Sequence, residues 1–275
     1  MPNAAPTDLA TALAVAFQPL MRGDSDRPFA WRAEVTGTGN NRWTLDDVVG
    51  LIAPAEGEAL VRYCAALAIE RAVARGLGRT EALLIVPVNA VCAETCQIVI
   101  EIAEAARAHG LAADRIVVEI SADERGDLES AERLAEACAL EGLSVALGGF
   151  TSGRVGLNLI ARFKPRFAML DRTLVRNLSS SDSRRSMVEG TVRLARGLDT
   201  ILIAPAAETQ DEQDTLRRIG ITHAARTAAL RPLPSAVAPR RAPRTAPVGT
   251  QRDAHAPRRV APTGSFANFE AVVSA

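Results

Sequence analysis

Two glutamates and an asparagine stand where chemistry could take place. Glu34, Asn89 and Glu119 each fall near the end of a short apolar segment that is typical of a β-strand. Carboxylate and amide oxygens are the ligands that Mg²⁺ and Mn²⁺ prefer in proteins. The three residues therefore form a candidate cation site. A structural interpretation stays open beside it, because single polar residues often close strand ends.

A glycine pair raises a second question. In the stretch "SVALGGFTSG", residues 144–153, an apolar run ends in Gly148 and Gly149. Glycines before a helix are typical of loops that hold a phosphate at the helix N-terminus, and a helix is predicted to follow here. The alternative interpretation is that larger working side chains have been lost from these two positions.

Alternating strand and helix segments must position these residues. Several predicted strands are almost continuously apolar, as in a parallel sheet covered on both faces. Repeated strand–helix units predict an α/β fold, either a (βα)8-type TIM barrel or a doubly wound sheet, and the number of strands favours the barrel. The predicted strands are 13–19, 29–36, 83–89, 115–120, 143–147, 167–171, 200–204 and 221–225. The predicted helices are 56–75, 92–109, 127–141, 153–162, 183–197 and 209–219.

The composition excludes several classes of protein. The formal net charge is zero, which argues against a dedicated nucleic-acid binder. No apolar run is long enough to span a membrane, and the first residues lack the pattern of a signal peptide, so we expect a cytoplasmic protein. The cysteines and histidines have no metal-ligand spacing, and we interpret the cysteines as small buried hydrophobic residues. Cys92 and Cys96, on a predicted helix, could share one face.

The chain divides into three regions by composition. Residues 1–12 form an N-terminal extension, and residues 13–234 form the barrel domain. Residues 235–275 are rich in proline, arginine and alanine, and we predict a disordered tail. Phe266, Phe269, Val272 and Val273 fall at helical spacing in this tail, so a short terminal helix is an alternative to a frayed end.

Eight short segments, in order, resemble the motifs of the EAL-domain family of cyclic-di-GMP phosphodiesterases. The first four are "FQPL" at 17–20, "AEVTG" at 33–37, "VPVNA" at 86–90 and "VVEISAD" at 117–123. The others are "VALGGFTSGRVGL" at 145–157, "FAMLDRTLVRNL" at 167–178, "LIAPAAETQDEQDTLRRIGI" at 202–221 and "RPLP" at 231–234. The resemblance implies a modified TIM barrel and a site in which Mg²⁺ or Mn²⁺ activates water against a phosphodiester.

The departures from these motifs matter as much as the matches. By this resemblance, Glu34, Asn89, Glu119 and Glu208 retain family positions for the metals, and Gln18 retains a contact to guanine. Other family positions are lost: Gly148 and Gly149 replace two aspartates, Met169 replaces a lysine, Pro205 replaces a glutamate, and Thr38 replaces an arginine that grips phosphate. The glycine pair is then better explained by lost carboxylates than by a phosphate loop.

The resemblance and its departures together predict a catalytically inactive, degenerate EAL-like domain. We expect no cofactor, since Mg²⁺ or Mn²⁺ would be needed only if residual activity existed, and we expect weak or no binding of cyclic-di-GMP. The predicted role is regulation through an unidentified protein partner in bacterial signalling, and a homodimer is expected by analogy. The alternatives are a cyclic-di-GMP receptor without hydrolysis and a residual phosphodiesterase that uses one metal.

Overall fold

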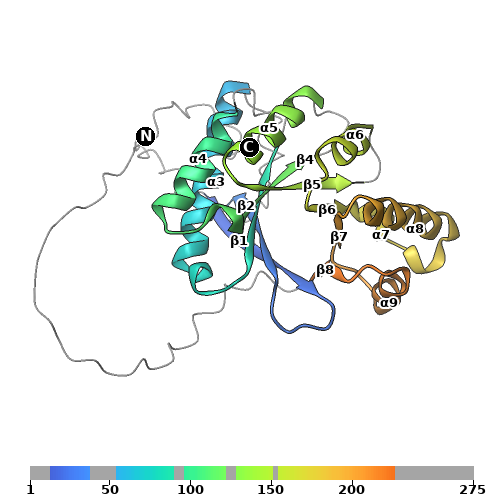
Figure 1. Ribbon diagram of the computed structural model, residues 1–275. Coiled ribbons are helices and arrows are strands. Elements are labelled where there is room, and N and C mark those ends of the chain that lie inside the picture. Colours follow the sequence, from blue (N-terminus) through green and yellow to red (C-terminus); the bar gives the residue numbers. More distant parts are fainter. Residues whose placement is uncertain (1–12, 38–53, 90–95, 122–127, 151–153, 227–275) are drawn as a thin grey trace, which may run out of the picture.

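Eight strands close into a barrel in which each strand lies beside its neighbours in sequence (Figure 1). The computed structural model describes residues 13–37, 54–89, 96–121, 128–150 and 154–226. The strands are β1 (Leu13–Arg22), β2 (Ala30–Gly37), β3 (Leu83–Val88), β4 (Ile116–Ser121), β5 (Ser144–Phe150), β6 (Phe167–Leu170), β7 (Ile201–Ala204) and β8 (His223–Ala225). The predicted α/β barrel is confirmed. The predicted tail, residues 235–275, lies outside the described residues.

One strand departs from the all-parallel pattern of a regular (βα)8 barrel. β1 runs antiparallel to both β2 and β8, whereas the pairs from β2 to β8 are parallel. Only a short turn separates β1 from β2, and a turn of that length can join antiparallel strands but not parallel ones. This arrangement is the modified barrel that the resemblance implied.

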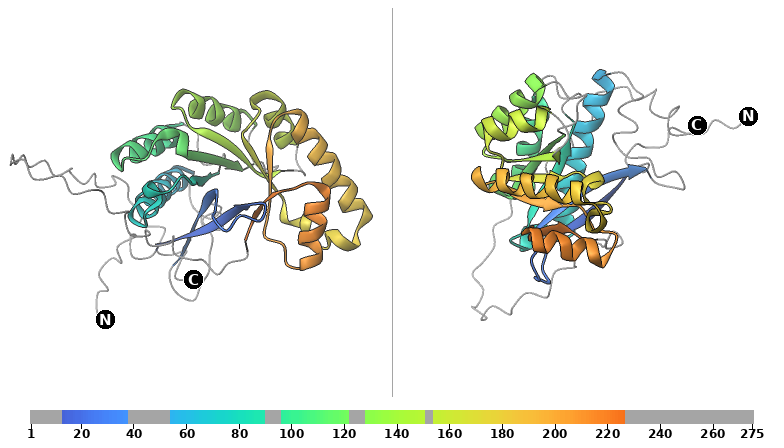
Figure 2. Two further views of the ribbon diagram at one scale, coloured as in Figure 1. Left: turned by 60° about the horizontal axis from the view of Figure 1, so that its bottom comes forward. Right: turned by 90° about the vertical axis from the view of Figure 1, so that its right-hand side faces the viewer.

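Helices cover the outside of the strands. They are α3 (Pro54–Ala74), α4 (Gln97–Ala108), α5 (Leu128–Leu140), α6 (Arg154–Phe163), α7 (Arg172–Val175), α8 (Asp182–Gly197) and α9 (Gln210–Ile219). Figure 2 shows them as an arc around the barrel. All the predicted helices are present. α7 was not predicted, because a single turn of helix is too short to show a periodic pattern. None of the described helices is long and apolar enough to cross a membrane.

Two layers of apolar side chains stabilise this arrangement. Alternate residues of each strand face the barrel interior, where Leu20, Ile85, Val117, Phe167 and Ile203 form one buried cluster. The residues between them face the helices and form a larger cluster with the inner faces of α3 to α9. Apolar side chains therefore fill the barrel interior near the starts of the parallel strands. The polar positions lie beyond this cluster, toward the carboxyl ends of the same strands.

Two sequence predictions need correction. β5 continues through Gly148 and Gly149 to Phe150, and its pairing with β6 shifts in register between Leu147 and Phe150, where Gly149 has a φ of 58°. α4 begins at Gln97, and Cys96 precedes it with a φ of 54°, so Cys96 does not lie on the predicted helix. Cys92 lies outside the described residues. Burial raises the pKa of the Cys64 and Cys138 thiols to about 12, as expected of small buried hydrophobic residues.

Candidate functional site

The predicted site residues lie on inward-facing positions at the carboxyl ends of consecutive strands. Glu34 lies two positions beyond Arg32 on β2, and Glu119 lies two positions beyond the interior residue Val117 on β4. Asn89 directly follows β3. The two-residue alternation of strands therefore places these side chains at one end of the barrel, which is the end where barrel enzymes carry their chemistry.

Arg32 is the residue that joins the two glutamates. Its Nε lies 2.6 Å from Oε2 of Glu119, and its Nη2 lies 3.0 Å from Oε1 of the same carboxylate. Its Nη1 donates to Oε1 of Glu34 at 3.3 Å. The Glu119 side chain is only 6% exposed, whereas that of Glu34 is 35% exposed. A bidentate guanidinium–carboxylate pair is among the strong hydrogen-bonded arrangements in proteins, so Arg32 fixes the orientation of Glu119.

Gly148 leaves the space that this carboxylate uses. It is buried on β5, and a Cβ atom added there would lie 2.8 Å from Oε1 of Glu119. Any larger residue at position 148 would require the Glu119 carboxylate to move away from its present contacts with Arg32. Gly149 differs, because its φ is 58° and a Cβ there would meet nothing within 4 Å. The two glycines therefore have separate structural roles, space at 148 and left-handed backbone at 149.

The other positions at which the resemblance predicts a departure from the family carry no groups suited to acid–base chemistry. Met169 is buried in the interior cluster beside Phe167, and its thioether holds no proton to transfer. Pro205 directly follows β7, and Thr38 lies outside the described residues. Gln18 is paired with Arg32 across the antiparallel ladder of β1 and β2, so it lies close to the ion-pair cluster.

Glu208 belongs to a separate ion-pair group. Its carboxylate lies 3.8 Å from Nη1 of Arg172 and 3.9 Å from Nε of Arg176, and all three side chains are about half or more exposed. The structure therefore brings Glu34 and Glu119 together through one arginine, and gives Glu208 two other arginines as its ion-pair partners. Exposed pairs at these distances are weak, because water screens them.

Glu212, which was not singled out from the sequence, is a second buried carboxylate. It accepts hydrogen bonds from the backbone N–H groups of Asn177 at 2.7 Å, Glu208 at 2.9 Å and Thr209 at 3.3 Å. Burial by itself would raise the pKa of this carboxyl, but the three N–H donors and Arg176 outweigh it and lower the pKa. Glu212 thereby ties the loop after α7 to the start of α9.

The described residues at the barrel end do not fit a pair of dications. Two-metal hydrolysis needs enough anionic oxygens to hold both ions a few ångströms apart. Here Arg32 already occupies both oxygens of Glu119 and one oxygen of Glu34. Among the residues that the structure describes, no group of three or more His, Cys, Asp or Glu side chains is placed to hold a metal. A dication would have to displace the Arg32 guanidinium from Glu119.

Arg32 itself was missed in the sequence, although a signal was present. It stands two residues before Glu34 in the predicted strand 29–36, so both side chains must lie on one face. Glu212 also had a signal, because Thr209 and Glu212 have the spacing of a capping box, which the structure contains at the start of α9. The roles of Arg32 and Glu212 can be assigned only when the structure shows which groups they contact, Glu119 for the first and the N–H group of Asn177 for the second.

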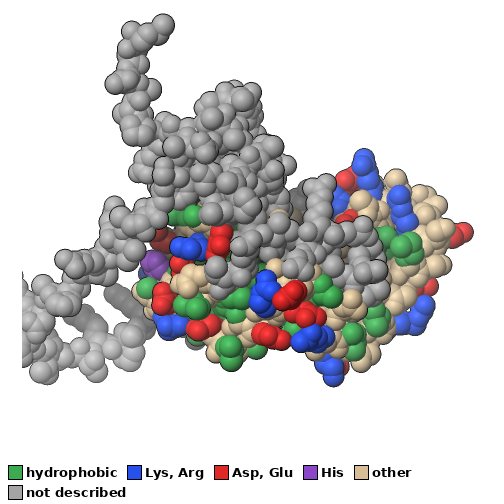
Figure 3. Space-filling view, turned by 90° about the horizontal axis from the view of Figure 1, so that it is seen from above, with side chains coloured by type: hydrophobic (Ala, Val, Ile, Leu, Met, Phe, Trp, Pro, Cys, Tyr) green, Lys and Arg blue, Asp and Glu red, His purple; other side chains and the backbone are tan. Residues whose placement is uncertain are grey.

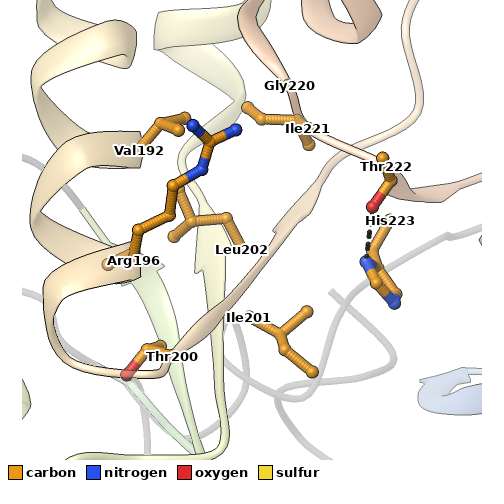
Figure 4. A pocket seen from close by; sticks show the side chains of 10 residues that line it. Val192, Arg196, Thr200, Ile201, Leu202, Gly220, Ile221, Thr222 and His223 are labelled. Carbon is orange, nitrogen blue, oxygen red and sulfur yellow. Dashed lines mark hydrogen bonds between the residues drawn. The ribbon is translucent and has the colours of Figure 1, made fainter.

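A hollow at the opposite end of the barrel contains none of the predicted residues. It has a volume of about 170 Å³ and lies between the C-terminal part of α8 and the starts of β7 and β8. Figure 4 shows Arg196 reaching toward Gly220 and Ile221, with Thr222 and His223 at the other side. Burial, and the charge of Arg22, lower the pKa of His223. The residues that line this hollow include neither Glu34 nor Glu119.

Comparison with known proteins now identifies the fold. The chain matches the EAL domain over residues 4–225. It is 25% identical to a standalone versatile EAL protein of Vibrio cholerae O395, solved in a c-di-GMP-bound form, with a TM-score of 0.67 over 78% of this chain and 89% of that one. The Klebsiella pneumoniae protein BlrP1, solved as a manganese and cyclic-di-GMP complex, is 23% identical with a TM-score of 0.70 and shares the fold over 82% of this chain and 58% of that one.

A curated relative is similar over a shorter stretch. BluF of Escherichia coli K12, a blue light- and temperature-regulated antirepressor, is 29% identical over 118 residues. The match spans 42% of this chain and only 29% of the length of BluF. The match to the EAL domain covers most of the barrel, from before β1 to the end of β8. The chain therefore belongs to the EAL domain family.

Proposed function

We propose that this protein is a catalytically inactive EAL domain that acts as a regulatory, protein-binding module in cyclic-di-GMP signalling. The observation that carries the proposal is the bidentate contact of Arg32 with Glu119, together with its contact to Glu34. A positive side chain of the protein itself stands where the family's chemistry would require metal ions.

The physical reason is the loss of an activated nucleophile. A metal ion lowers the pKa of its bound water to about 7 and so generates hydroxide at neutral pH. A guanidinium has no coordination site for water and stays protonated, so it cannot do the same. Met169 adds no proton donor. Groups that act as one catalytic unit fail together, so we expect no residual hydrolysis from the glutamates that remain.

Two observations support a role in protein contacts. Met187 and Leu194 are 52% and 39% exposed and lie seven residues apart on α8, which is two helical turns, so they share a face. On the face drawn in Figure 3, side chains of both charges lie among apolar ones, as on the surface of most globular proteins. The relative BluF is named as an antirepressor, which is a regulatory role.

The test is hydrolysis of cyclic-di-GMP by the full chain with millimolar Mg²⁺ or Mn²⁺. We expect no product above that formed by the Glu119→Gln variant, which serves as the matched control for trace contaminants. Turnover of about one per second in the wild type that disappears in Glu119→Gln would contradict the proposal. A stoichiometric metal ion in protein purified without chelator would point the same way.

A second candidate function is a cyclic-di-GMP receptor without hydrolysis. The observation that favours it is that EAL relatives were solved with this nucleotide bound, and that Gln18 retains its family position beside Arg32. Isothermal titration separates the candidates. Micromolar or tighter binding that weakens in Gln18→Ala would favour the receptor, whereas absence of binding favours the protein-binding module.

A further inference from the structure

We propose that the Arg32 guanidinium is an internal replacement for a metal ion, and that removing its charge converts Glu34 and Glu119 into a site for one divalent cation. The proposal deepens the proposed function, because it names what fills the barrel end in place of a metal. It is tested by cation binding and not by turnover, so the two proposals can fail separately.

The contacts of Arg32 resemble those of a bound cation. The guanidinium engages both oxygens of Glu119, at 2.6 and 3.0 Å, and reaches Glu34 at 3.3 Å. It thus bridges a carboxylate on β2 and a carboxylate on β4, two strands that are separated by β3 in the barrel wall. A cation that gathers carboxylates from separate strands is the role that a metal would have in such a site.

The charges of Glu34 and Glu119 explain why a divalent cation could take the place of the Arg32 guanidinium. Glu119 is almost completely buried, and a buried carboxylate without a partner is strongly unfavourable. With Arg32 present, two carboxylates share one positive charge. Without it, the same two carboxylates present two negative charges at one place, which a dication would neutralise completely. The vacated volume also lies at the barrel end, where the partly exposed Glu34 gives access to solvent.

Gly148 is part of the same adaptation. A side chain at this position would press on Oε1 of Glu119, the atom that receives the Nη2 donor of Arg32. The loss of a side chain at 148 and the presence of arginine at 32 are therefore coupled through one carboxylate. An aspartate restored at 148 would not by itself recreate a metal site, because Arg32 would still hold Glu119.

The experiment is a titration of the full chain with Mn²⁺ alone, followed by calorimetry and by the loss of the free-Mn²⁺ electron paramagnetic resonance signal. The proteins are the wild type, Arg32→Ala, Arg32→Gln and the control Arg62→Ala, which removes a comparable arginine from the pair with Glu101 on the helical layer. Arg32→Gln retains the ability to donate hydrogen bonds to Glu119 and so guards against simple unfolding.

We expect both Arg32 variants to bind one Mn²⁺ at least about tenfold more tightly than the wild type, a difference equal to the loss of one opposing charge near the ion. We also expect Mn²⁺ to raise the melting temperature of these variants but not of Arg62→Ala. Equal affinity in all four proteins, or stoichiometric binding by the wild type, would overturn the proposal. Failure of both Arg32 variants to bind would overturn it as well.

Discussion

Glu119 and Glu212 are both buried carboxylates, but they are stabilised in different ways. Glu119 is 5% exposed and depends on one side chain, that of Arg32, which comes from another strand. Glu212 is 3% exposed and depends on three backbone N–H groups, one of which, that of Thr209, belongs to its own capping box. The first arrangement can be undone by one substitution, whereas the second is built into the local chain path.

The two carboxylates also differ in what their contacts do for the molecule. Glu212 connects the loop after α7 with the start of α9 through hydrogen bonds to backbone N–H groups. Glu119, at which the sequence resemblance predicts a metal ligand, accepts the ion pair from Arg32. At the strand ends, Glu34 and Glu119 share one positive charge, that of Arg32.

The largest effect is expected from Arg32→Ala. It leaves Glu119 buried without its partner, and breaking a buried ion pair in this way costs about 3 kcal/mol of the free energy of unfolding. Urea unfolding in the absence of divalent cations measures this loss. The control is Arg62→Ala, whose more exposed pair contributes about 0.5 kcal/mol.

A double variant tests the origin of that loss. Adding Glu119→Gln to Arg32→Ala removes the uncompensated charge, so part of the lost stability should return. If the double variant has a lower free energy of unfolding than Arg32→Ala, the uncompensated charge of Glu119 is not the cause of the loss, and the ion pair is not what stabilises this end of the barrel.

The next effect is that of Glu212→Ala, which leaves three backbone N–H donors without their acceptor. We expect a loss of about 2 kcal/mol in urea unfolding, and a smaller loss for Glu212→Gln, whose amide oxygen still accepts hydrogen bonds. A local readout sharpens the test, because hydrogen exchange should accelerate at the amides of Asn177, Glu208 and Thr209. Unchanged exchange at all three would contradict the assigned contacts.

The two glycines should respond to alanine for different reasons. Gly148→Ala is expected to cost about 2 kcal/mol, because the new Cβ displaces the Glu119 carboxylate. Gly149→Ala is expected to cost about 1 kcal/mol, because a φ of 58° is unfavourable for alanine although space is available. Only the first loss should shrink when Arg32→Ala is already present, since Glu119 is then free to move.

The smallest effect concerns acid. The pKa of Glu212 is lowered in the folded state, so its contribution is complete above the ordinary glutamate value of 4.5 and is lost as the pH falls through the folded-state pKa. The stability difference between the wild type and Glu212→Gln should therefore narrow below about pH 4.5. A difference that stayed constant from pH 7 to pH 3 would show that the ionised carboxylate contributes nothing.

The sequence predicted the barrel well because several strands are short, almost continuously apolar runs and most helices have apolar residues at helical spacing. It predicted the positions of Glu34, Asn89 and Glu119 at strand ends, which follow from the same alternation. It could not predict that Arg32 turns toward Glu119, 87 residues further along the chain, because that contact depends on barrel closure. It also could not separate the steric role of Gly148 from the conformational role of Gly149, which requires backbone angles and neighbours.

A crystal structure of the wild type grown with millimolar Mn²⁺ shows whether Arg32 or a metal ion pairs with Glu34 and Glu119. An anomalous difference map would locate any ion at the strand ends. We expect no manganese peak there, and we expect the Arg32 guanidinium to contact both oxygens of Glu119. Two well-occupied manganese ions beside Glu34 and Glu119, with Arg32 displaced, would contradict it.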